Sequence, residues 1–410
     1  MKKKILIMGI ETSCDETAVS IIQDNGTKPP KILANIVSSQ EEVHKKFGGV
    51  VPELAARSHL EKIEMITKKA LKKSRVKLNN IDAISATAGP GLIVCLSVGF
   101  NFAKSLSLAL KKPLIAVNHL EGHALSPMFN NNIKFPYLLL LISGGHTQYL
   151  IVKGLGKYKR IGTTIDDALG EAFDKTAKIL GFGFPGGPKI EKCAKKGNQK
   201  NFVLPKPIIN RGGCNLSFAG LKTAVFRSFK IIKNEQQKYD LAASFQKTIS
   251  DIIYKKTKVA INEFKKNYKG NKLIVAGGVA ANKEIRKTIK RTCLEEKFEA
   301  IFPELDLCSD NAAMIAIVGL KKFKKKEFKK LNFSVNPRWQ LDKNAKLKSF
   351  ISLSILALAF FLDFSELKFS VFSKYAMSTF LYFVKRISSL IDHSSDNLIL
   401  DAFVEYICFI

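Results

Sequence analysis

Apolar and polar positions follow the same order at two places in this chain, and each place predicts a β-hairpin. Residues 5–10 form an apolar run, a polar turn follows at 11–17, and a second apolar run occupies 18–22. The same order recurs over residues 137–152. Short apolar runs bounded by Gly, Ser, Asp and Thr are typical of strands joined by a tight turn. The repetition predicts a duplicated α/β fold, with two lobes around a central cleft.

Strands and helices are predicted to alternate after each hairpin, which favours mixed sheets flanked by helices. The predicted strands are 81–86, 113–117 and 273–276, and the predicted helices are 92–110, 167–180, 239–264, 282–297 and 310–325.

We expect a first lobe at residues 1–118 that is completed by a returning helix within 310–342, and a second lobe at 119–309. Residues 343–410 form a hydrophobic C-terminal extension to which the sequence assigns no role. Its most apolar stretch, 351–364, is shorter than the ~20 residues that span a bilayer and contains an acidic residue, so we do not expect a membrane partner.

Charge and cysteine content bear on the partner and the compartment. The formal net charge of +31 favours a phosphate-rich partner such as nucleic acid. A codon bias towards Lys, Ile, Asn and Phe explains the same charge equally well, so both interpretations stay open. The seven cysteines are odd in number and form no Cys-x-x-Cys pair, which argues against a zinc ribbon or a disulfide framework and predicts a reducing cytoplasm. Acidic residues interrupt the apolar N-terminal stretch, which therefore predicts a first strand rather than a signal peptide.

A pair of histidines predicts a metal site. His119 and His123 are four positions apart, and such residues project from one face of a helix and can bind one ion. Two histidines hold a catalytic metal weakly, and we expect Asp310 to be the third ligand. This donor set suits iron, zinc and other divalent ions, so the ligands alone do not identify the metal, for which we expect iron, with zinc as the alternative.

Three glycine-rich turns follow predicted strands or helices, at residues 143–147, 186–188 and 276–282. Without a Cβ, the backbone amides of such turns can approach an anion closely. Together the turns favour a nucleotide-like ligand. Carboxylates lie beside them at Asp15, Asp174 and Glu191, although Asp15 could simply stabilise its turn and Asp174 could be a solvated helix residue.

These segments closely resemble the TsaD family, the tRNA N6-adenosine threonylcarbamoyltransferases, over about residues 5–342. Residues 343–410 have no counterpart in the family pattern, and Ala219 stands where the family often has Ser. The matching motifs are Gly9 to Thr17, His44 with Phe47 to Glu53, Thr87 to Leu92, His119 to His123, Ser143 to Gln148, Asp166 to Lys178, Phe184 to Pro188, Leu216 to Lys222, Ala276 to Asn282, Asp310-Asn311 and Pro337 to Trp339.

The resemblance implies the duplicated fold of actin, Hsp70 and sugar kinases. It also implies transfer of a threonylcarbamoyl group from threonylcarbamoyl-adenylate to N6 of adenosine 37 in tRNAs that read ANN codons, giving t6A and AMP. The implied partners are tRNA and, in bacteria, an inactive paralogue and a small ATPase. We expect Asp15 to orient or deprotonate the amine. By resemblance His119, His123 and Asp310 bind the metal, and Leu141, Ile142, Ser143, Gly144, Gly145, Asp174, Gly187, Glu191 and Asn282 bind the adenylate.

Three other functions compete with this one. A metalloprotease of the zincin type needs Glu directly after the first His, but here Leu120 follows His119 and the acid is Glu121. An ATPase or small-molecule kinase on the same fold would use Mg²⁺, to which two histidines are poorly suited. A non-catalytic tRNA-binding scaffold would not require the metal-binding residues at all.

Overall fold

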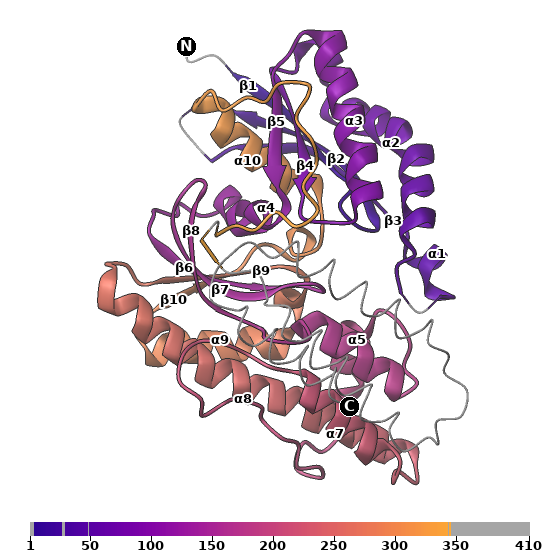
Figure 1. The fold of residues 1–410 in the computed structure, drawn as a ribbon, viewed down its shortest axis with the longest axis vertical. Coiled ribbons are helices and arrows are strands. Elements are labelled where there is room, and N and C mark those ends of the chain that lie inside the picture. The colour runs from indigo at the N-terminus through magenta and orange to yellow at the C-terminus, as the bar shows by residue number, and fades with distance from the viewer. Residues whose placement is uncertain (1–3, 27–28, 48, 343, 346–410) are drawn as a thin grey trace, which may run out of the picture. The chain divides into compact units, whose positions relative to one another are not determined.

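The computed structural model describes residues 4–26, 29–47, 49–342 and 344–345, and within them two five-stranded sheets share one topology (Figure 1). The first sheet has the order β3-β2-β1-β4-β5 and the second the order β8-β7-β6-β9-β10. The strands are β1 Ile5–Glu11, β2 Glu16–Asp24, β3 Lys31–Ser39, β4 Ala83–Gly89, β5 Leu114–Asn118, β6 Tyr137–Ile142, β7 Thr147–Gly154, β8 Lys157–Thr163, β9 Lys272–Ala276 and β10 Glu299–Ile301.

Strand pairing is the same in both sheets. β1 pairs antiparallel with β2, and β2 pairs antiparallel with β3, while β4 and β5 extend the sheet in parallel. In the second sheet β6, β7 and β8 are the antiparallel part, and β9 and β10 are the parallel part. Both predicted hairpins and the duplication are therefore confirmed, and each half adds a third antiparallel strand that was not predicted.

Helices cover the sheets on both faces. Their bounds are α1 Glu41–Lys45, α2 Pro52–Ser74, α3 Ile93–Leu110, α4 His119–Leu125, α5 Leu169–Ile179, α6 Gly186–Ala194, α7 Ala219–Phe229, α8 Glu235–Asn267, α9 Lys283–Glu295 and α10 Ala312–Lys324, with short 3₁₀ turns at Leu78–Asn80, Ser126–Phe129, Gly278–Ala281 and Leu305–Leu307. The five predicted helices correspond to α3, α5, α8, α9 and α10. α1, α2, α6 and α7 lie outside the predicted helices.

Alternate residues of each strand enter different cores, as the two-residue period of a strand requires. Met8 of β1 packs in a core with α2 and α3, while its neighbour Ile7 packs in a core with α10. In the second sheet, Leu140 of β6 packs in a core with α5 to α9. Its neighbour Leu139 joins the same core as Ile7, together with α4 and α10. α4 and α10 thus lie in a core that both sheets share (Figure 1).

Two predictions concern membranes and the chain's organisation. Among the described helices, α3 is the one that is long and apolar enough to cross a membrane, but it packs against β4 and α2 as a core helix does.

The predicted extension lies outside the described residues apart from 344–345. The boundaries of the two lobes stay a prediction, although α10 does pack on β1, β2 and β4 of the first sheet.

Candidate active site

α4 begins directly after β5 and presents the histidine pair. Asn118 ends β5 and caps the helix, because its Oδ1 accepts hydrogen bonds from the backbone N–H groups of Leu120 (2.9 Å) and Glu121 (3.3 Å). The seven-residue helix is wholly buried. Its geometry places His119 and His123 on one face, as the spacing predicts.

The structure brings His119, His123 and Asp310 together. One ligand atom from each residue lies within 4.8 Å of the other two. Asp310 Oδ1 is 3.0 Å from His123 Nε2 and 3.4 Å from His119 Nε2. Asp310 comes two residues before α10, so the third ligand arrives from a segment 187 positions away from His123. Two imidazole nitrogens and a carboxylate oxygen are donors that fit one divalent transition-metal ion.

A buried carboxylate fixes the ring of His119. Glu11, the last residue of β1, has Oε2 3.0 Å from His119 Nδ1, and Ser13 Oγ lies 3.1 Å from the same nitrogen. Glu11 is itself held by the backbone N–H of Ser13 and by the hydroxyl of Thr87, each at 2.5 Å. This pattern, in which Nδ1 bonds a carboxylate and leaves Nε2 free to bind, is typical of metal-ligating histidines. Neither Glu11 nor Ser13 was predicted as a site residue.

The charges in the cluster are strongly coupled. Burial opposes ionisation of His119, but Asp310 and then Glu11 outweigh it and hold the pKa of His119 well above its usual range. Burial likewise opposes ionisation of Glu11 and Asp310, and His119 outweighs it, so the pKa of each carboxyl lies below its usual value. The buried carboxylate of Glu11 and the partly buried carboxylate of Asp310 therefore share one cationic partner, which is an environment suited to a bound cation.

The turn between β1 and β2 carries Asp15 beside this cluster. Asp15 is partly buried and neighbours Glu16, whose pKa lies well above its usual range because of burial first and then Asp310 and Asp15. Burial also raises the pKa of Asp174, and Asp15 adds to that effect. Asp15 is thus within electrostatic range of Glu16 beside the metal ligands and of Asp174 in the predicted adenylate site. Glu16 was not predicted as a site residue.

The end of β6 and the turn between β6 and β7 contain five of the predicted adenylate-binding residues. Leu141 and Ile142 are completely buried in β6, so only their backbone could meet a ligand. Ser143 closes the turn, because its N–H donates to the carbonyl of His146 at 2.8 Å. Gly144 and Gly145 are exposed, and a Cβ on either would meet no atom within 4 Å. The glycines therefore leave open space above the turn.

The remaining four predicted residues join neighbouring helix ends. Asp174 of α5 accepts a hydrogen bond from the N–H of Gly186 at the start of α6 (2.7 Å). Glu191 of α6 accepts one from the N–H of Lys283 at the start of α9 (3.1 Å). Asn282 caps α9 by accepting from the N–H of Ile285 at 3.0 Å. The last of the four, Gly187, lies in the first turn of α6 and faces open space.

Glu121, the acidic residue between the two histidines, does not contact the proposed metal ligands. Glu121 is buried, and its carboxylate contacts Gly156, Tyr158 and Lys322 instead of the metal ligands. In a zincin the corresponding acid must reach water bound to the metal. The contacts of Glu121 therefore speak against proteolysis.

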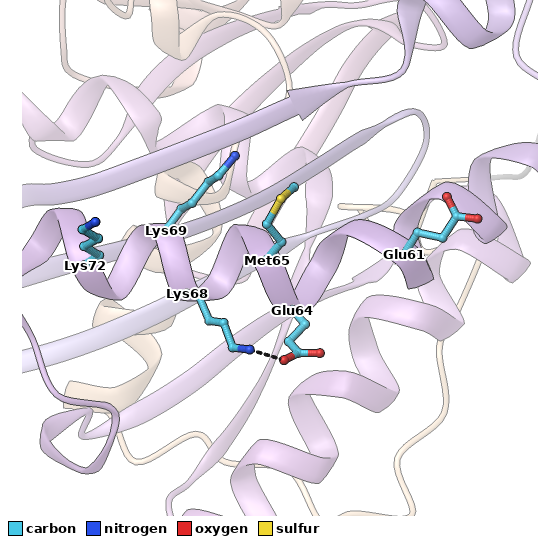
Figure 2. A pocket seen from close by; sticks show the side chains of 6 residues that line it. All are labelled: Glu61, Glu64, Met65, Lys68, Lys69 and Lys72. Carbon is cyan, nitrogen blue, oxygen red and sulfur yellow. Dashed lines mark ion pairs between the residues drawn. The ribbon is translucent and has the colours of Figure 1, made fainter.

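A surface hollow lies along the outer face of α2, and none of the predicted site residues lines it. Figure 2 shows its lining, in which Lys68 and Glu64 form an ion pair. None of its side chains belongs to the histidine cluster or to the glycine-rich turns. The lining residues are Glu61, Glu64, Met65, Lys68, Lys69 and Lys72.

Several known proteins that are similar in sequence to this chain carry one name. The family model described as tRNA N6-adenosine threonylcarbamoyltransferase, TsaD, matches residues 31–317. The chain belongs to this family. A relative of that name from Pelagibacter ubique (strain HTCC1062) is 66% identical over 347 residues, which cover 84% of this chain and 97% of the relative. Another from Rickettsia rickettsii (strain Sheila Smith) is 53% identical over 343 residues, which cover 82% of this chain and 98% of the relative.

Solved structures show the same fold. Full-length HypF in a phosphate- and nucleotide-bound form has a TM-score of 0.51 at 14% identity, covering 80% of this chain and 47% of that one. HypF of T. kodakarensis has a TM-score of 0.52 at 15% identity, covering 78% of this chain and 48% of that one. The chain thus spans about half of each HypF chain. The predicted actin, Hsp70 and sugar-kinase fold class is confirmed, as is the family.

Proposed function

We propose that this transferase moves the threonylcarbamoyl group from threonylcarbamoyl-adenylate to N6 of adenosine 37 in tRNAs that read ANN codons, releasing AMP and forming t6A. The chain belongs to a family that is named after this reaction, and this membership supports the proposal. The observation that carries the site is the meeting of His119, His123 and Asp310 within 4.8 Å, with Glu11 holding His119.

The histidine cluster is proposed to hold one divalent metal ion. Two imidazoles and a carboxylate suit iron, with zinc as the alternative. Such an ion supplies Lewis-acid stabilisation of negative charge on a nearby phosphate oxygen. Glu11 contributes by fixing the ring of His119 through Nδ1, so that Nε2 faces Asp310.

The adenylate is proposed to lie over the glycine-rich turns. Open space above Gly144, Gly145 and Gly187 allows backbone amides to approach it closely. Leu141, Ile142 and Ser143 form the strand end below the turn, and Asp174, Glu191 and Asn282 hold the adjoining helix ends. The N-terminal ends of helices favour a phosphate group.

The transfer itself requires little covalent chemistry from the protein. The carbonyl carbon of the adenylate is already activated, because it is bonded to a phosphate oxygen. N6 of the adenine forms a bond to that carbon, the bond to phosphate breaks, AMP leaves, and N6 gives up one proton. The enzyme must therefore hold the two reactants within ~3.5 Å of each other. Asp15 is proposed to orient the amine or accept its proton.

The proposed setting is cytoplasmic. Besides tRNA, the proposed partners are an inactive paralogue subunit and a small ATPase subunit of the bacterial t6A complex. The described residues contain six cysteines, all of them free thiols, which is compatible with a reducing compartment.

The test uses the purified chain with its proposed partner subunits, threonylcarbamoyl-adenylate and unmodified tRNA. We expect mass spectrometry of tRNA nucleosides to detect t6A with the wild type and at least about 100-fold less with His119→Ala, whose bound metal should also be lost. Tyr149→Phe is the control, because Tyr149 is buried outside the cluster and its hydroxyl bonds Thr257. No t6A from a folded, metal-loaded wild type would refute the transfer, and full activity of a metal-free His119→Ala would refute the metal site.

A further inference from the structure

α4 is a very short helix that carries two of the three metal ligands. Residues two positions apart on a helix differ by about 200° around its axis. Glu121 therefore projects from the side of α4 that lies opposite His119, and this side holds no metal ligand. A seven-residue helix has little stability of its own, so its rotation must be fixed by contacts with its surroundings.

Both oxygens of the Glu121 carboxylate have partners. Oε1 accepts hydrogen bonds from the backbone N–H of Gly156 and from the hydroxyl of Tyr158, each at 2.9 Å. Oε2 is 3.1 Å from the ammonium group of Lys322. Lys322 in turn donates to the carbonyl of Ala116 at 3.2 Å. The buried charge is thus paired and fully hydrogen-bonded.

These partners come from both sheets. Gly156 and Tyr158 belong to the β7–β8 hairpin of the second sheet. Lys322 belongs to α10, which also follows Asp310, and its carbonyl partner Ala116 lies in β5 of the first sheet. One carboxylate consequently joins α4 to the helix behind the third ligand and to each of the two sheets.

The two histidines differ in how they are held. Glu11 and Ser13 hold Nδ1 of His119. In contrast, Nδ1 of His123 is buried and has no hydrogen-bond partner among the described residues. The direction of the His123 ring therefore depends on the position of the α4 backbone, which Glu121 anchors.

We infer that Glu121 is a positioning residue: its carboxylate fixes the rotation of α4 between the two sheets and thereby aims His119 and His123 at Asp310. The inference rests on the proposed metal site. Glu121 does not act as a general base, because its oxygens are buried and engaged on the side of α4 away from the ligands.

The experiment compares two variants of this contact with one matched control in the full-length chain. Glu121→Gln replaces the carboxylate by an amide of similar shape, and Tyr158→Phe removes one hydroxyl. The control is Tyr149→Phe, because Tyr149 is also a buried tyrosine and its hydroxyl bonds Thr257 in the core beyond the second sheet. The measurements are Zn²⁺ affinity by competition with a chromogenic chelator, the Tm, and kcat and KM for tRNA.

We expect Glu121→Gln to weaken Zn²⁺ binding by about 10- to 100-fold, because mutation of residues that hold metal ligands in place has effects of this size in other metalloproteins. Tyr158→Phe should weaken it by a smaller factor. Tyr149→Phe should lower the Tm about as much as Tyr158→Phe and leave Zn²⁺ affinity unchanged. In the two Glu121-contact variants kcat should fall while KM for tRNA stays the same, because both substituted side chains are buried. The double variant should be little weaker than Glu121→Gln alone, because the hydroxyl acts through the carboxylate.

Several results would overturn the inference. The first is a folded Glu121→Gln variant that binds Zn²⁺ as tightly as the wild type. If Glu121→Gln does not fold, wild-type Zn²⁺ affinity in Tyr158→Phe would overturn the inference. An equal loss of affinity in Tyr149→Phe would reduce the effect to general stability. His119→Ala separates this inference from the proposed function. If wild type and His119→Ala bind Zn²⁺ alike, the metal site itself is wrong, whereas loss only in His119→Ala, with Glu121→Gln unaffected, removes the role of Glu121 alone.

Discussion

The neighbours of His59, a buried histidine beside the site, determine which of its ring nitrogens carries the proton. Its Nε2 lies 2.9 Å from the carbonyl oxygen of Cys14, which can only accept, so this nitrogen carries the proton. Its Nδ1 then accepts from the hydroxyl of Thr17 (2.8 Å) and the side-chain amide of Gln40 (3.2 Å). A second proton on Nδ1 would oppose the amide N–H of Gln40, although the hydroxyl of Thr17 could turn to accept from it and the bond to Cys14 would stay. The neutral form of His59 therefore fits these partners best.

This arrangement predicts a loss of stability in mild acid. Burial lowers the pKa of His59 below its usual 6.5, so the unfolded chain binds a proton more readily than the folded one. The contribution of His59 is fully present above about pH 6.5 and is lost as the pH falls towards the lower folded-state value. Urea unfolding between about pH 7.5 and 5 should show a steeper loss for the wild type than for His59→Gln, by up to about 1.4 kcal/mol per pH unit. Parallel curves for the two proteins would contradict the prediction.

The shared face of His119 and His123 could be predicted because its signal is local: residues four positions apart on one helix lie on one side of it. The partner of His119 could not, because Glu11 lies 108 positions away and meets it only when β1 and α4 pack together. The role of Glu121 is equally hidden, since its partners Tyr158 and Lys322 come from β8 and α10. The ligand roles of the residues in the glycine-rich turns stay predictions.

At the scale of elements, the packing of α10 on β1 depends on one missing side chain. A Cβ on Gly9 would lie 2.3 Å from the carbonyl oxygen of Ala312 and 2.9 Å from Cβ of Ala316. Gly9→Ala should therefore push α10 away from β1, lower the free energy of unfolding by about 1–3 kcal/mol and weaken metal binding by moving Asp310. Chemical denaturation and chelator competition measure the two effects. Gly154→Ala is the control, because its nearest contact would be Lys157 Cδ at 3.9 Å; equal losses in both variants would contradict this account.

Several of the elements that were not predicted have weak patterns, although α2, a regular helix of 23 residues, does not. β3 and β8 are edge strands of their sheets, and each mixes exposed and buried positions without a continuous apolar run. α6 begins with Gly186-Gly187-Pro188, which indicates a turn as readily as a helix start. By contrast α3, α8 and α9 are long enough for their periodicity to identify them, and their ends differ from the predicted ones by a few residues.

For the whole molecule, the distribution of charge bears on the choice between codon bias and nucleic-acid binding. Residues 346–410 contain six Lys or Arg and six Asp or Glu, so the entire net charge of +31 resides in residues 1–345. A codon bias acting evenly along the gene would make both parts basic. The excess instead coincides with the part that contains the family match and the described sheets, which favours a role in binding tRNA.

This distribution predicts how the shortened protein behaves. A chain that ends at residue 345 keeps the full net charge, and the Pelagibacter relative matches 84% of this chain with 97% of its own length. We expect this shortened chain to bind tRNA and form t6A within about twofold of the full chain. For both chains the affinity for tRNA should fall by about 10³-fold or more between about 50 and 200 mM salt, as counterion release from six or more phosphate contacts requires. Filter binding at several salt concentrations measures this, with Zn²⁺ affinity as the salt-insensitive control. If the affinity for tRNA does not change with salt, codon bias becomes the better explanation of the net charge. If the shortened chain does not bind tRNA, part of the tRNA site lies beyond residue 345.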